Sequence, residues 1–545
     1  MSRSWRSPYW LLLAFAVFLA APSWATTGLA GAAVGMIGLR SVRFLAARRI
    51  AGTSPKDAIA IGTDGSGREV SLSERELSAH GLILGASGAG KTNALRTILT
   101  QQIRRGRPVV VIDMKGSPEF ARQLAEAAAS ARRPFKVWTP DGPNQWNPLQ
   151  YGNATELKDK LICTERFTEP HYQRAAERYV QAVLQVLQAS HPDTAPTLEE
   201  VVNLLDPRRL PTALRGVPHP LANRVQDYLA GLTPDQLSAV RGLQTRLAIV
   251  TESHTGSYLA ADVHRLGPDR AAGANTVGEV AGAKPNVRSS LVDLRAALEG
   301  PGVVLFSLNS SKYGQLAAQL GTLAVQDLIC ATGNRLEDRR AGRQQEQATI
   351  AIDEFSGIGG DHAIALFARC REAGVSVLVA TQEMADLDRA GRGLRDQVLG
   401  NTAVKLILRQ DVPASAQMIA QIAGTERTIE ETREIGGTLF SGYPGRGTRR
   451  EAEQFVIHPN EIKSLGIGDA VLISKLRGGK ARTIQIHPPQ RDSAQPAQRG
   501  AAQPAQRGLA RPQPSPAQPP QRGAAGSPRR GASRTPRADG ELERG

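Results

Sequence analysis

The sequence predicts an α/β fold in which a central, mostly parallel β-sheet is interrupted by an inserted all-α domain. Short apolar runs alternate with helical stripes over residues 51–153 and 266–487, and this alternation is typical of parallel strands with helices on both faces. Residues 154–265 instead hold several helical stripes and few runs that suit a strand. The chain has 545 residues, of which 41% are hydrophobic, so it can bury a core of this size.

The first 50 residues predict a membrane anchor. No charged residue occurs between Ser7 and Leu39, whereas arginines lie on both sides of this stretch. A single span needs about 20 apolar residues, so the stretch is longer than one helix and short for two. Two helices with a turn at 22–27 would leave both arginine clusters in the cytoplasm, as the positive-inside rule favours. One long tilted helix and a cleaved signal peptide are the alternatives.

The elements of the α/β part follow in order along the chain. Residues 57–71 alternate in polarity and turn at Asp64-Gly65, which predicts a small β-lobe, and residues 428–487 predict a β-rich end with hairpins. An apolar stripe from Ala94 to Ile103 predicts the helix that joins the first two core strands. The apolar runs predicted as core strands are Leu82–Leu84, Val109–Ile112, Val303–Phe306, Thr349–Ile352, Val375–Ala380 and Val404–Leu408.

The positive charge of the chain is concentrated at its two ends. The formal net charge is +16, of which residues 1–50 contribute +6, residues 488–545 another +6, and the body only +4. This distribution excludes a uniformly basic surface that coats nucleic acid. Residues 488–545 are rich in Pro, Gln, Arg, Ala and Gly, and the segment SAQPAQRG at 493–500 recurs as AAQPAQRG at 501–508, so they predict a disordered tail. The three cysteines lie far apart, which excludes a disulfide framework.

A phosphate-binding loop is the strongest motif in the chain. It matches GxxxxGK(S/T) between a predicted strand and a predicted helix, which is the context that such a loop requires. Its small residues let backbone N–H groups surround phosphate oxygens at a helix N-terminus. Lys91 would reach the β- and γ-phosphates of ATP, and Thr92 would bind Mg²⁺. The residues of the loop are Gly85, Ala86, Ser87, Gly88, Ala89, Gly90, Lys91 and Thr92.

Two carboxylates after the apolar strand at 349–352 predict the second half of an ATPase site. Asp353 would hold Mg²⁺ through water, and Glu354 would orient and activate the attacking water. The strand at 375–380 ends near Gln382, and because parallel strands end at one edge of a sheet, this amide would sense the γ-phosphate or the water. An ATPase has no ATP outside the cell, which argues against the signal-peptide alternative.

Three further residues have less specific signals. Arg371 lies on the helix before the strand at 375–380, where it could act as an arginine finger in a neighbouring subunit or simply be solvated. Asp113 and Lys115 end the strand at 109–112 and would lie close to the nucleotide edge, although a structural turn explains them equally well.

Together these motifs resemble the type IV coupling proteins of conjugation, the TraG/TraD class within the FtsK/HerA group of motor ATPases. The resemblance covers about residues 57–485 and includes Asp-x-Lys-Gly at 113–116, Asn-Pro-Leu at 147–149, and the Arg371 and Gln382 positions. It implies a RecA-like P-loop NTPase domain with a smaller all-α domain, an anchor in the bacterial inner membrane, an ATPase body in the cytoplasm, and a homohexameric ring around a DNA channel.

The resemblance also implies a function. The chain would be a membrane-anchored, ATP-driven translocase of DNA or relaxase–DNA, with ATP and Mg²⁺ as cofactors and with DNA, relaxase or relaxosome proteins and type IV secretion channel proteins as partners. The alternatives are an ATP-switched docking receptor for secretion cargo and a chromosome-handling DNA pump of the same group. Two features depart from the family: Ser117 replaces the usual acidic residue after Asp-x-Lys-Gly, and the outer loop between the two membrane arms is very short.

Overall fold

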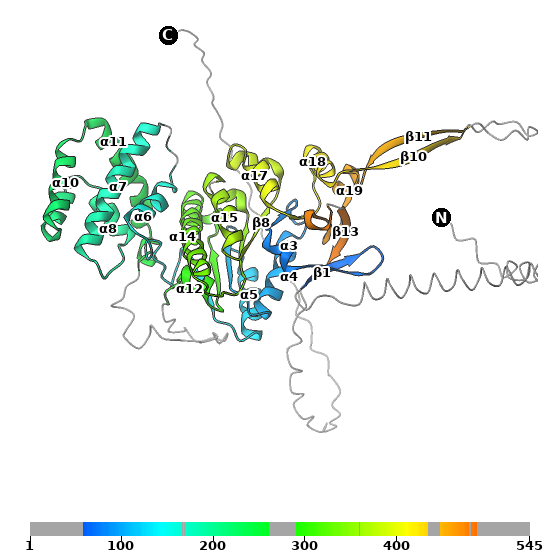
Figure 1. Ribbon diagram of the computed structural model, residues 1–545, viewed down its shortest axis with the longest axis horizontal. Coiled ribbons are helices and arrows are strands. Elements are labelled where there is room, and N and C mark those ends of the chain that lie inside the picture. Colours follow the sequence, from blue (N-terminus) through cyan, green and yellow to red (C-terminus); the bar gives the residue numbers. More distant parts are fainter. Residues whose placement is uncertain are drawn as a thin grey trace, which may run out of the picture. The chain divides into compact units, whose positions relative to one another are not determined.

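The structure is a computed structural model (Figure 1), and part of the chain is described in it. The predicted membrane anchor at 1–50 and the predicted disordered tail at 488–545 lie outside the described residues. None of the helices in the described part has the length and apolar character needed to cross a bilayer. The described residues are 58–165, 167, 169–260, 290–358, 360–433, 447–478 and 481–487.

Eleven strands of the described chain form one sheet in the order β2-β1-β13-β12-β9-β3-β8-β7-β4-β6-β5. The pairs from β9 to β5 are parallel and the remaining four pairs are antiparallel, so the predicted mostly parallel sheet is confirmed. The strands are β1 Ile59–Asp64, β2 Glu69–Leu72, β3 Gly81–Leu84, β4 Val109–Asp113, β5 Phe135–Trp138, β6 Val303–Ser307, β7 Ala348–Asp353, β8 Val375–Thr381, β9 Val404–Ile407, β12 Asp469–Ser474 and β13 Ala481–Ile486.

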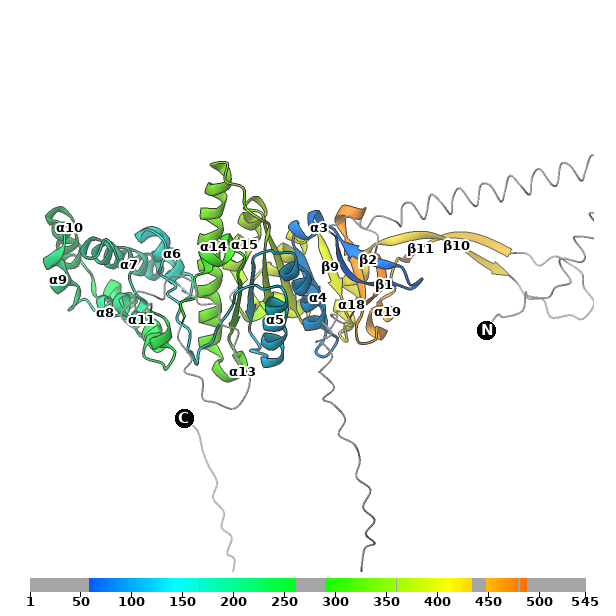
Figure 2. The ribbon, with the colours of Figure 1, turned by 90° about the horizontal axis from the view of Figure 1, so that it is seen from below.

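One prediction about the ends of the sheet needs correction. The hairpin of β1 and β2 is not a separate lobe, because β1 pairs with β13 and so extends the edge of the main sheet. The β-rich end at 428–487 contains two antiparallel strand pairs. β12 and β13 join the main sheet, whereas β10 (Thr425–Arg433) and β11 (Gly447–Phe455) form a separate ribbon that projects from it (Figure 2). β5 was not predicted at all.

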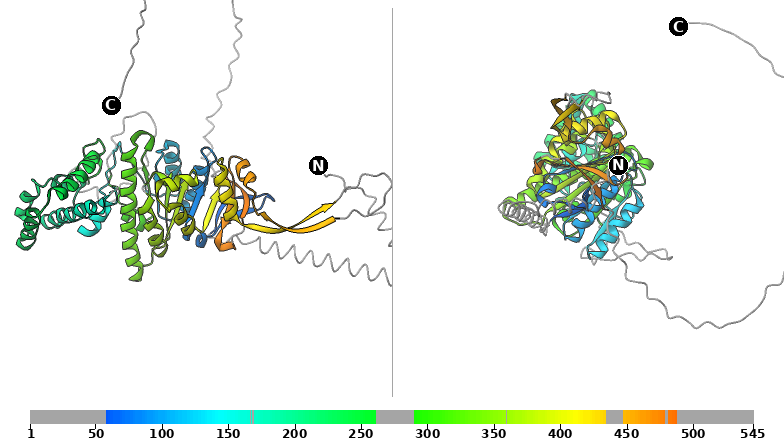
Figure 3. Two further views of the ribbon diagram at one scale, coloured as in Figure 1. Left: turned by 90° about the horizontal axis from the view of Figure 1, so that it is seen from above. Right: turned by 90° about the vertical axis from the view of Figure 1, so that its right-hand side faces the viewer.

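Helices cover both faces of the sheet, as the strand composition predicts (Figure 3). Consecutive side chains of a strand point to opposite faces, and in β4 Val109 and Val111 pack in one apolar cluster while Val110 and Ile112 pack in the other. The first cluster includes residues of α4 (Lys91–Arg104) and α5 (Pro118–Ser130). The remaining helices of the α/β part are α3 Glu74–Ser78, α12 Leu294–Glu299, α13 Ser310–Tyr313, α14 Gln315–Arg340, α15 Gly360–Glu372, α16 Met384–Ala390, α17 Leu394–Asn401, α18 Pro413–Ala423 and α19 Pro459–Ser464.

Six α-helices between residues 154 and 251 form a group apart from the sheet, drawn in cyan and green in Figure 1. Their apolar stripes meet in a shared core, to which the longest of them contributes Tyr179, Val183 and Val186. The first of the six packs against α14 of the α/β part. The six helices are α6 Ala154–Ile162, α7 Pro170–Ser190, α8 Leu198–Leu204, α9 Leu210–Ala213, α10 His219–Ala230 and α11 Pro234–Thr251.

The register of the parallel strands determines where the polar side chains gather. Asp113 at the end of β4 is level with Asp353 at the end of β7, and Leu84 at the end of β3 is level with Thr381 at the end of β8. The carboxyl ends of β3, β4, β7 and β8 therefore lie along one edge of the sheet, which is where ligands bind in open α/β folds.

Candidate nucleotide site

The phosphate-loop motif forms a tight turn between β3 and α4, as predicted. Gly88 and Gly90 have φ angles of 76° and 110°, which only glycine adopts readily. A side chain on Gly85 would place its Cβ 2.8 Å from the Cβ of Leu408, so the loop packs closely on the chain that follows β9. The N–H of Ala86 donates a hydrogen bond of 2.8 Å to the carbonyl oxygen of Arg409 in the same segment. The loop is thus held from outside as well as by its own turn.

Lys91 folds back over this loop. Its ammonium group donates to the carbonyl oxygen of Gly85 at 2.7 Å and to that of Ala86 at 3.4 Å. Burial lowers the pKa of Lys91 below its ordinary value, and the nearby charge of Lys115 acts in the same direction. A buried ammonium that donates to carbonyl oxygens gains a favourable interaction when a phosphate approaches, because the phosphate brings a negatively charged acceptor.

The structure places Thr92 and Asp353 together, although they lie far apart in the sequence. The Thr92 hydroxyl donates to Oδ2 of Asp353 at 3.1 Å. Burial raises the pKa of Asp353, and the positive charge of Lys115 opposes this shift only in part. A hydroxyl and a carboxylate in contact are oxygen ligands of the type that Mg²⁺ uses beside ATP phosphates.

Glu354 has an unusual backbone and a strongly held side chain. Its φ and ψ angles are 55° and 51°, in the left-handed region that residues other than glycine rarely occupy. The Glu354 N–H donates to Oδ1 of Asp353 at 3.0 Å. Its Oε1 accepts a hydrogen bond of 2.9 Å from the side-chain amide of Gln382 and lies 2.5 Å from the ammonium of Lys115. Gln382 therefore lies in the site, where the sequence predicted it.

Asp113 and Lys115 have different roles in the turn after β4. The Asp113 carboxylate accepts the backbone N–H groups of Lys115 and Ser117 at 2.9 and 2.8 Å, and burial raises its pKa. Asp113 thus shapes the turn, while the side chain of Lys115 reaches Glu354. The departure at Ser117 has a structural explanation, because the Ser117 hydroxyl accepts the N–H of Phe120 and caps the start of α5.

Arg371 lies away from the other predicted residues. It stands at the end of α15, just before β8 begins, whereas the nucleotide edge lies at the other end of β8, next to Thr381. A strand of this length spans about 20 Å at the usual rise per residue. The side chain is exposed, and its charge contributes to lowering the pKa of His80, which also lies at the far edge. The Arg371 of one chain therefore does not reach the nucleotide site of that chain.

The residues present fit ATP with Mg²⁺ and not a metal held by protein alone. Within the described ranges, no group of three or more His, Cys, Asp or Glu side chains could hold a metal ion. Mg²⁺ usually binds through one or two protein oxygens together with phosphate oxygens and water, and the Thr92–Asp353 pair matches that pattern.

Two family models match separate parts of the chain, and the first of them extends into the helical insertion. Residues 59–208 match the model described as the central domain of the helicase HerA. Residues 347–466 match the model described as the TraM recognition site of TraD and TraG. The predicted resemblance to coupling-type ATPases is confirmed. The chain therefore carries a P-loop NTPase domain, and residues 59–208 resemble the central domain of HerA. No curated protein sequence gives a significant match.

Solved structures support the same fold. The unbound bacterial conjugative coupling protein TrwB gives a TM-score of 0.59 at 14% identity, over 82% of this chain and 92% of that chain. TrwB with a non-hydrolysable GTP analogue gives 0.56 at 14% identity over 82% and 94%, and TrwB with ADP and Mg²⁺ gives 0.54 at 13% identity over 82% and 93%. At such low identity the likeness shows the shared α/β P-loop fold alone.

Proposed function

We propose that the chain is a conjugative coupling ATPase that uses ATP hydrolysis to move DNA, or a relaxase–DNA complex, to a type IV secretion channel. The observation that carries this proposal is the contact of four residues from three separate parts of the sequence: Thr92, Asp353, Glu354 and Gln382. A phosphate loop, a metal-binding pair and a held carboxylate at one sheet edge are the components of phosphoryl transfer to water.

Each side chain has a defined task in this mechanism. The loop N–H groups and Lys91 bind the phosphates. Thr92 and Asp353 would hold Mg²⁺, which would supply positive charge to the transferred phosphoryl group. Glu354 orients the attacking water and takes up its proton. Gln382 directly follows β8 and contacts Glu354. Loss of the γ-phosphate would therefore change the position of Gln382, and this change would pass to β8. Arg371 of a neighbouring subunit would stabilise the charge on the transferred phosphoryl group.

The wider assignment depends on the resemblance to coupling proteins. We propose a homohexamer around a DNA channel, anchored in the bacterial inner membrane by residues 1–50 and with the ATPase body in the cytoplasm. The family description for residues 347–466 names TraM recognition, so a relaxosome protein is the proposed partner of this part of the chain. The proposed partners also include the channel proteins.

ATP hydrolysis by the full-length chain, measured with and without DNA, tests the proposal. We expect DNA to stimulate turnover, and we expect Lys91→Ala and Glu354→Gln each to abolish it, because the first removes the phosphate ligand and the second removes the carboxylate that activates water. Lys158→Met is the matched control, since Lys158 is an ion-paired lysine on α6, in the helical insertion, and it should hydrolyse ATP normally.

Two outcomes would contradict the motor. Turnover that DNA does not change would remove the link between hydrolysis and DNA. Normal conjugative transfer by cells that carry Glu354→Gln would show that hydrolysis is dispensable, and the chain would then be a docking receptor that only switches with bound ATP.

A further inference from the structure

Lys115 is a charged residue at the nucleotide edge to which the proposed mechanism gives no task. It lies in the turn after β4, and its backbone N–H is fixed by Oδ1 of Asp113 at 2.9 Å. The opposite charges of Asp353 and Glu354 raise its pKa despite the opposing effect of burial. Its side chain is 40% exposed and could extend into solvent, yet its ammonium lies 2.5 Å from Oε1 of Glu354.

The position of Glu354 in the sheet explains why such a contact matters. Glu354 directly follows β7, and the two neighbours of β7 in the sheet are β4 and β8. Lys115 follows β4 and Gln382 follows β8, so the two donors reach the carboxylate from the two flanking strands. Both donors contact Oε1, which leaves Oε2 as the oxygen that can take the proton of a water.

The backbone of Glu354 makes this bracing necessary. A glutamate in the left-handed region has no preference of its own for that conformation, and its backbone N–H is held only by the adjacent Asp353. The side chain also lies within the electrostatic influence of Lys91. A carboxylate free to turn towards Lys91 would pair with the lysine that the phosphates need.

We propose that Lys115 is a positioning residue for ATP hydrolysis, which holds Glu354 by its Oε1 so that Oε2 faces the attacking water. This inference rests on the proposed ATPase function. A half-exposed ion pair adds little stability, so the effect of Lys115 is on the orientation of Glu354 rather than on folding. Misplacing a reacting group by about 1 Å lowers rates on the order of 100-fold.

The test is steady-state ATP hydrolysis by the full-length chain over a range of ATP concentrations. For Lys115→Met we expect kcat to fall about 10- to 100-fold while KM for ATP stays within about twofold, because the phosphate ligands are untouched. Lys115→Arg retains the charge and the reach of the side chain, so it should restore part of kcat. Lys158→Met, which removes an ion-paired lysine from the helical insertion, should match the wild type.

A second measurement separates an effect through Glu354 from a direct one. In single turnovers, Lys115→Met combined with Glu354→Gln should be no slower than Glu354→Gln alone, since a positioning residue has no effect once its target is removed. If Lys115→Met does not fold, judged by thermal unfolding, Lys115→Gln takes its place in both measurements.

The outcomes distinguish this inference from the proposed function. A wild-type chain without ATPase activity would contradict the function itself. An active wild type that Glu354→Gln inactivates, together with an unchanged or raised kcat in Lys115→Met, would overturn only the inference. A KM that rises by the factor by which kcat falls would also overturn it, because Lys115 would then be a nucleotide ligand.

Discussion

The contact between Lys115 and Glu354 depends on the shape of the turn after β4, and Gly116 allows that shape. It follows Lys115 with a φ of 66°, and a Cβ at this position would lie 2.7 Å from the backbone nitrogen of Asn309. The turn is further tied to the next strand connection, since the N–H of Ser310 donates to the carbonyl oxygen of Met114 at 2.7 Å. No side chain larger than hydrogen fits this turn without a shift of the backbone.

We therefore expect Gly116→Ala to destabilise the protein by about 1–3 kcal/mol through backbone strain, with a further cost from the clash. Because the turn carries Lys115, ATPase activity should fall as well. Gly342→Ala is the matched control: Gly342 also has a positive φ, of 82°, but a Cβ there meets no atom within 4 Å. Urea denaturation measures both variants. Equal destabilisation of the two would show that the contact with Asn309 does not matter.

Between elements, a buried imidazole joins α15 to the sheet at the edge opposite the nucleotide. The Nε2 of His80 lies 2.9 Å from the carbonyl oxygen of Phe367 in α15, and its Nδ1 accepts the N–H of Val377 in β8 at 3.1 Å. This arrangement requires the neutral ring with the proton on Nε2. Burial, assisted by the charge of Arg371, lowers the pKa of His80 from 6.5 to about 4 despite the favourable contact with Phe367.

The pKa of His80 predicts a loss of stability in acid. Between pH 6.5 and pH 4 the unfolded chain binds a proton at His80 that the folded chain does not, so the free energy of unfolding falls as the pH falls. The full effect is about 3 kcal/mol. Denaturation at several pH values should show a shallower pH dependence for His80→Asn than for the wild type. Parallel curves would contradict this account.

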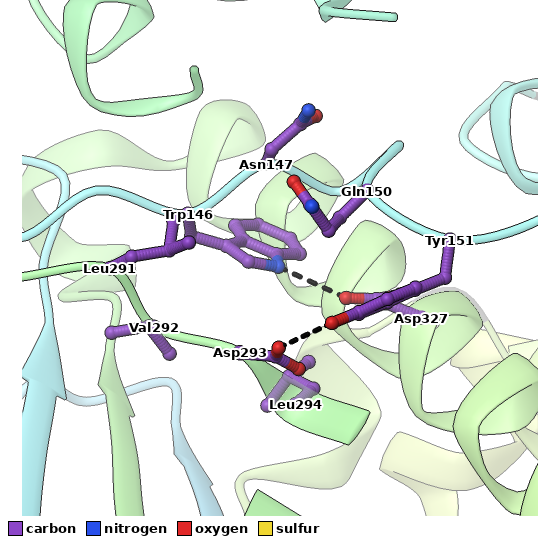
Figure 4. Close-up of a pocket in the computed structure, with 9 residues that line it drawn as sticks. All are labelled: Trp146, Asn147, Gln150, Tyr151, Leu291, Val292, Asp293, Leu294 and Asp327. Carbon is purple, nitrogen blue, oxygen red and sulfur yellow. Dashed lines mark hydrogen bonds between the residues drawn. The ribbon is translucent and has the colours of Figure 1, made fainter. Parts of the chain in front are cut away.

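A second link between elements connects the helical insertion to the α/β part. Asp327 of α14 is buried and accepts a hydrogen bond of 2.8 Å from the ammonium of Lys160 in α6. It also accepts the indole N–H of Trp146 at 3.1 Å (Figure 4). Tyr151 lies beside them, and its hydroxyl donates to Asp293 at 2.5 Å. Burial raises the pKa of Asp327 although Lys160 opposes this shift. The Asn-Pro-Leu segment thus leads into a charged contact that fixes α6 on α14.

Removing one partner of this pair should be costly. We expect Lys160→Met to destabilise the protein by about 3–5 kcal/mol, because it leaves the Asp327 charge buried without its partner. Adding Asp327→Leu should recover part of the loss, since both charges are then absent. Recovery is partial because the Trp146 N–H loses its acceptor and the carbonyl oxygens of Pro148 and Tyr151 lose the Lys160 donor. Urea denaturation followed by tryptophan fluorescence gives both values. A double variant less stable than Lys160→Met would contradict this explanation.

Local patterns predicted those elements whose signal is contained in a few consecutive residues. The six core strands were predicted because strands buried on both faces read as apolar runs, and β7 is an example. β5 was missed because it is a four-residue edge strand with Lys136 exposed in its middle. The joining of β12 to β9 was missed because this pairing depends on contacts between distant segments, which periodicity does not contain.

In the nucleotide site, too, local motifs could be predicted and contacts between distant segments could not. The phosphate loop and the acidic pair were predicted because each is a contiguous motif with a fixed chemistry. The left-handed backbone of Glu354 and its contact with Lys115 were not predicted, since they arise from three strand ends that only the sheet order brings together. The sequence placed Lys115 close to the nucleotide edge, but its contact with Glu354 depends on the order of the strands in the sheet.

At the scale of the whole molecule, the two edges of the sheet have different functions in the proposed ring. Lys91 and Glu354 lie at the carboxyl ends of the parallel strands, whereas Arg371, at the end of α15, lies at their amino ends. A chain cannot supply both to one nucleotide, because the length of β8 separates them. In a ring of identical subunits related by rotation, the same interface repeats around the ring, so the exposed arginine of one subunit can complete the site of the next.

Mixed rings test this division of labour. Arg371→Ala and Lys91→Ala should each be inactive alone, but mixing and reassembling them should restore activity, because a site with Lys91 can then receive Arg371 from its neighbour. With equal random mixing, about a quarter of the sites are complete. Mixing Lys91→Ala with Glu354→Gln is the control, since both residues act in the same chain and no complete site can form. Absence of rescue at every mixing ratio would show that Arg371 does not act across the interface.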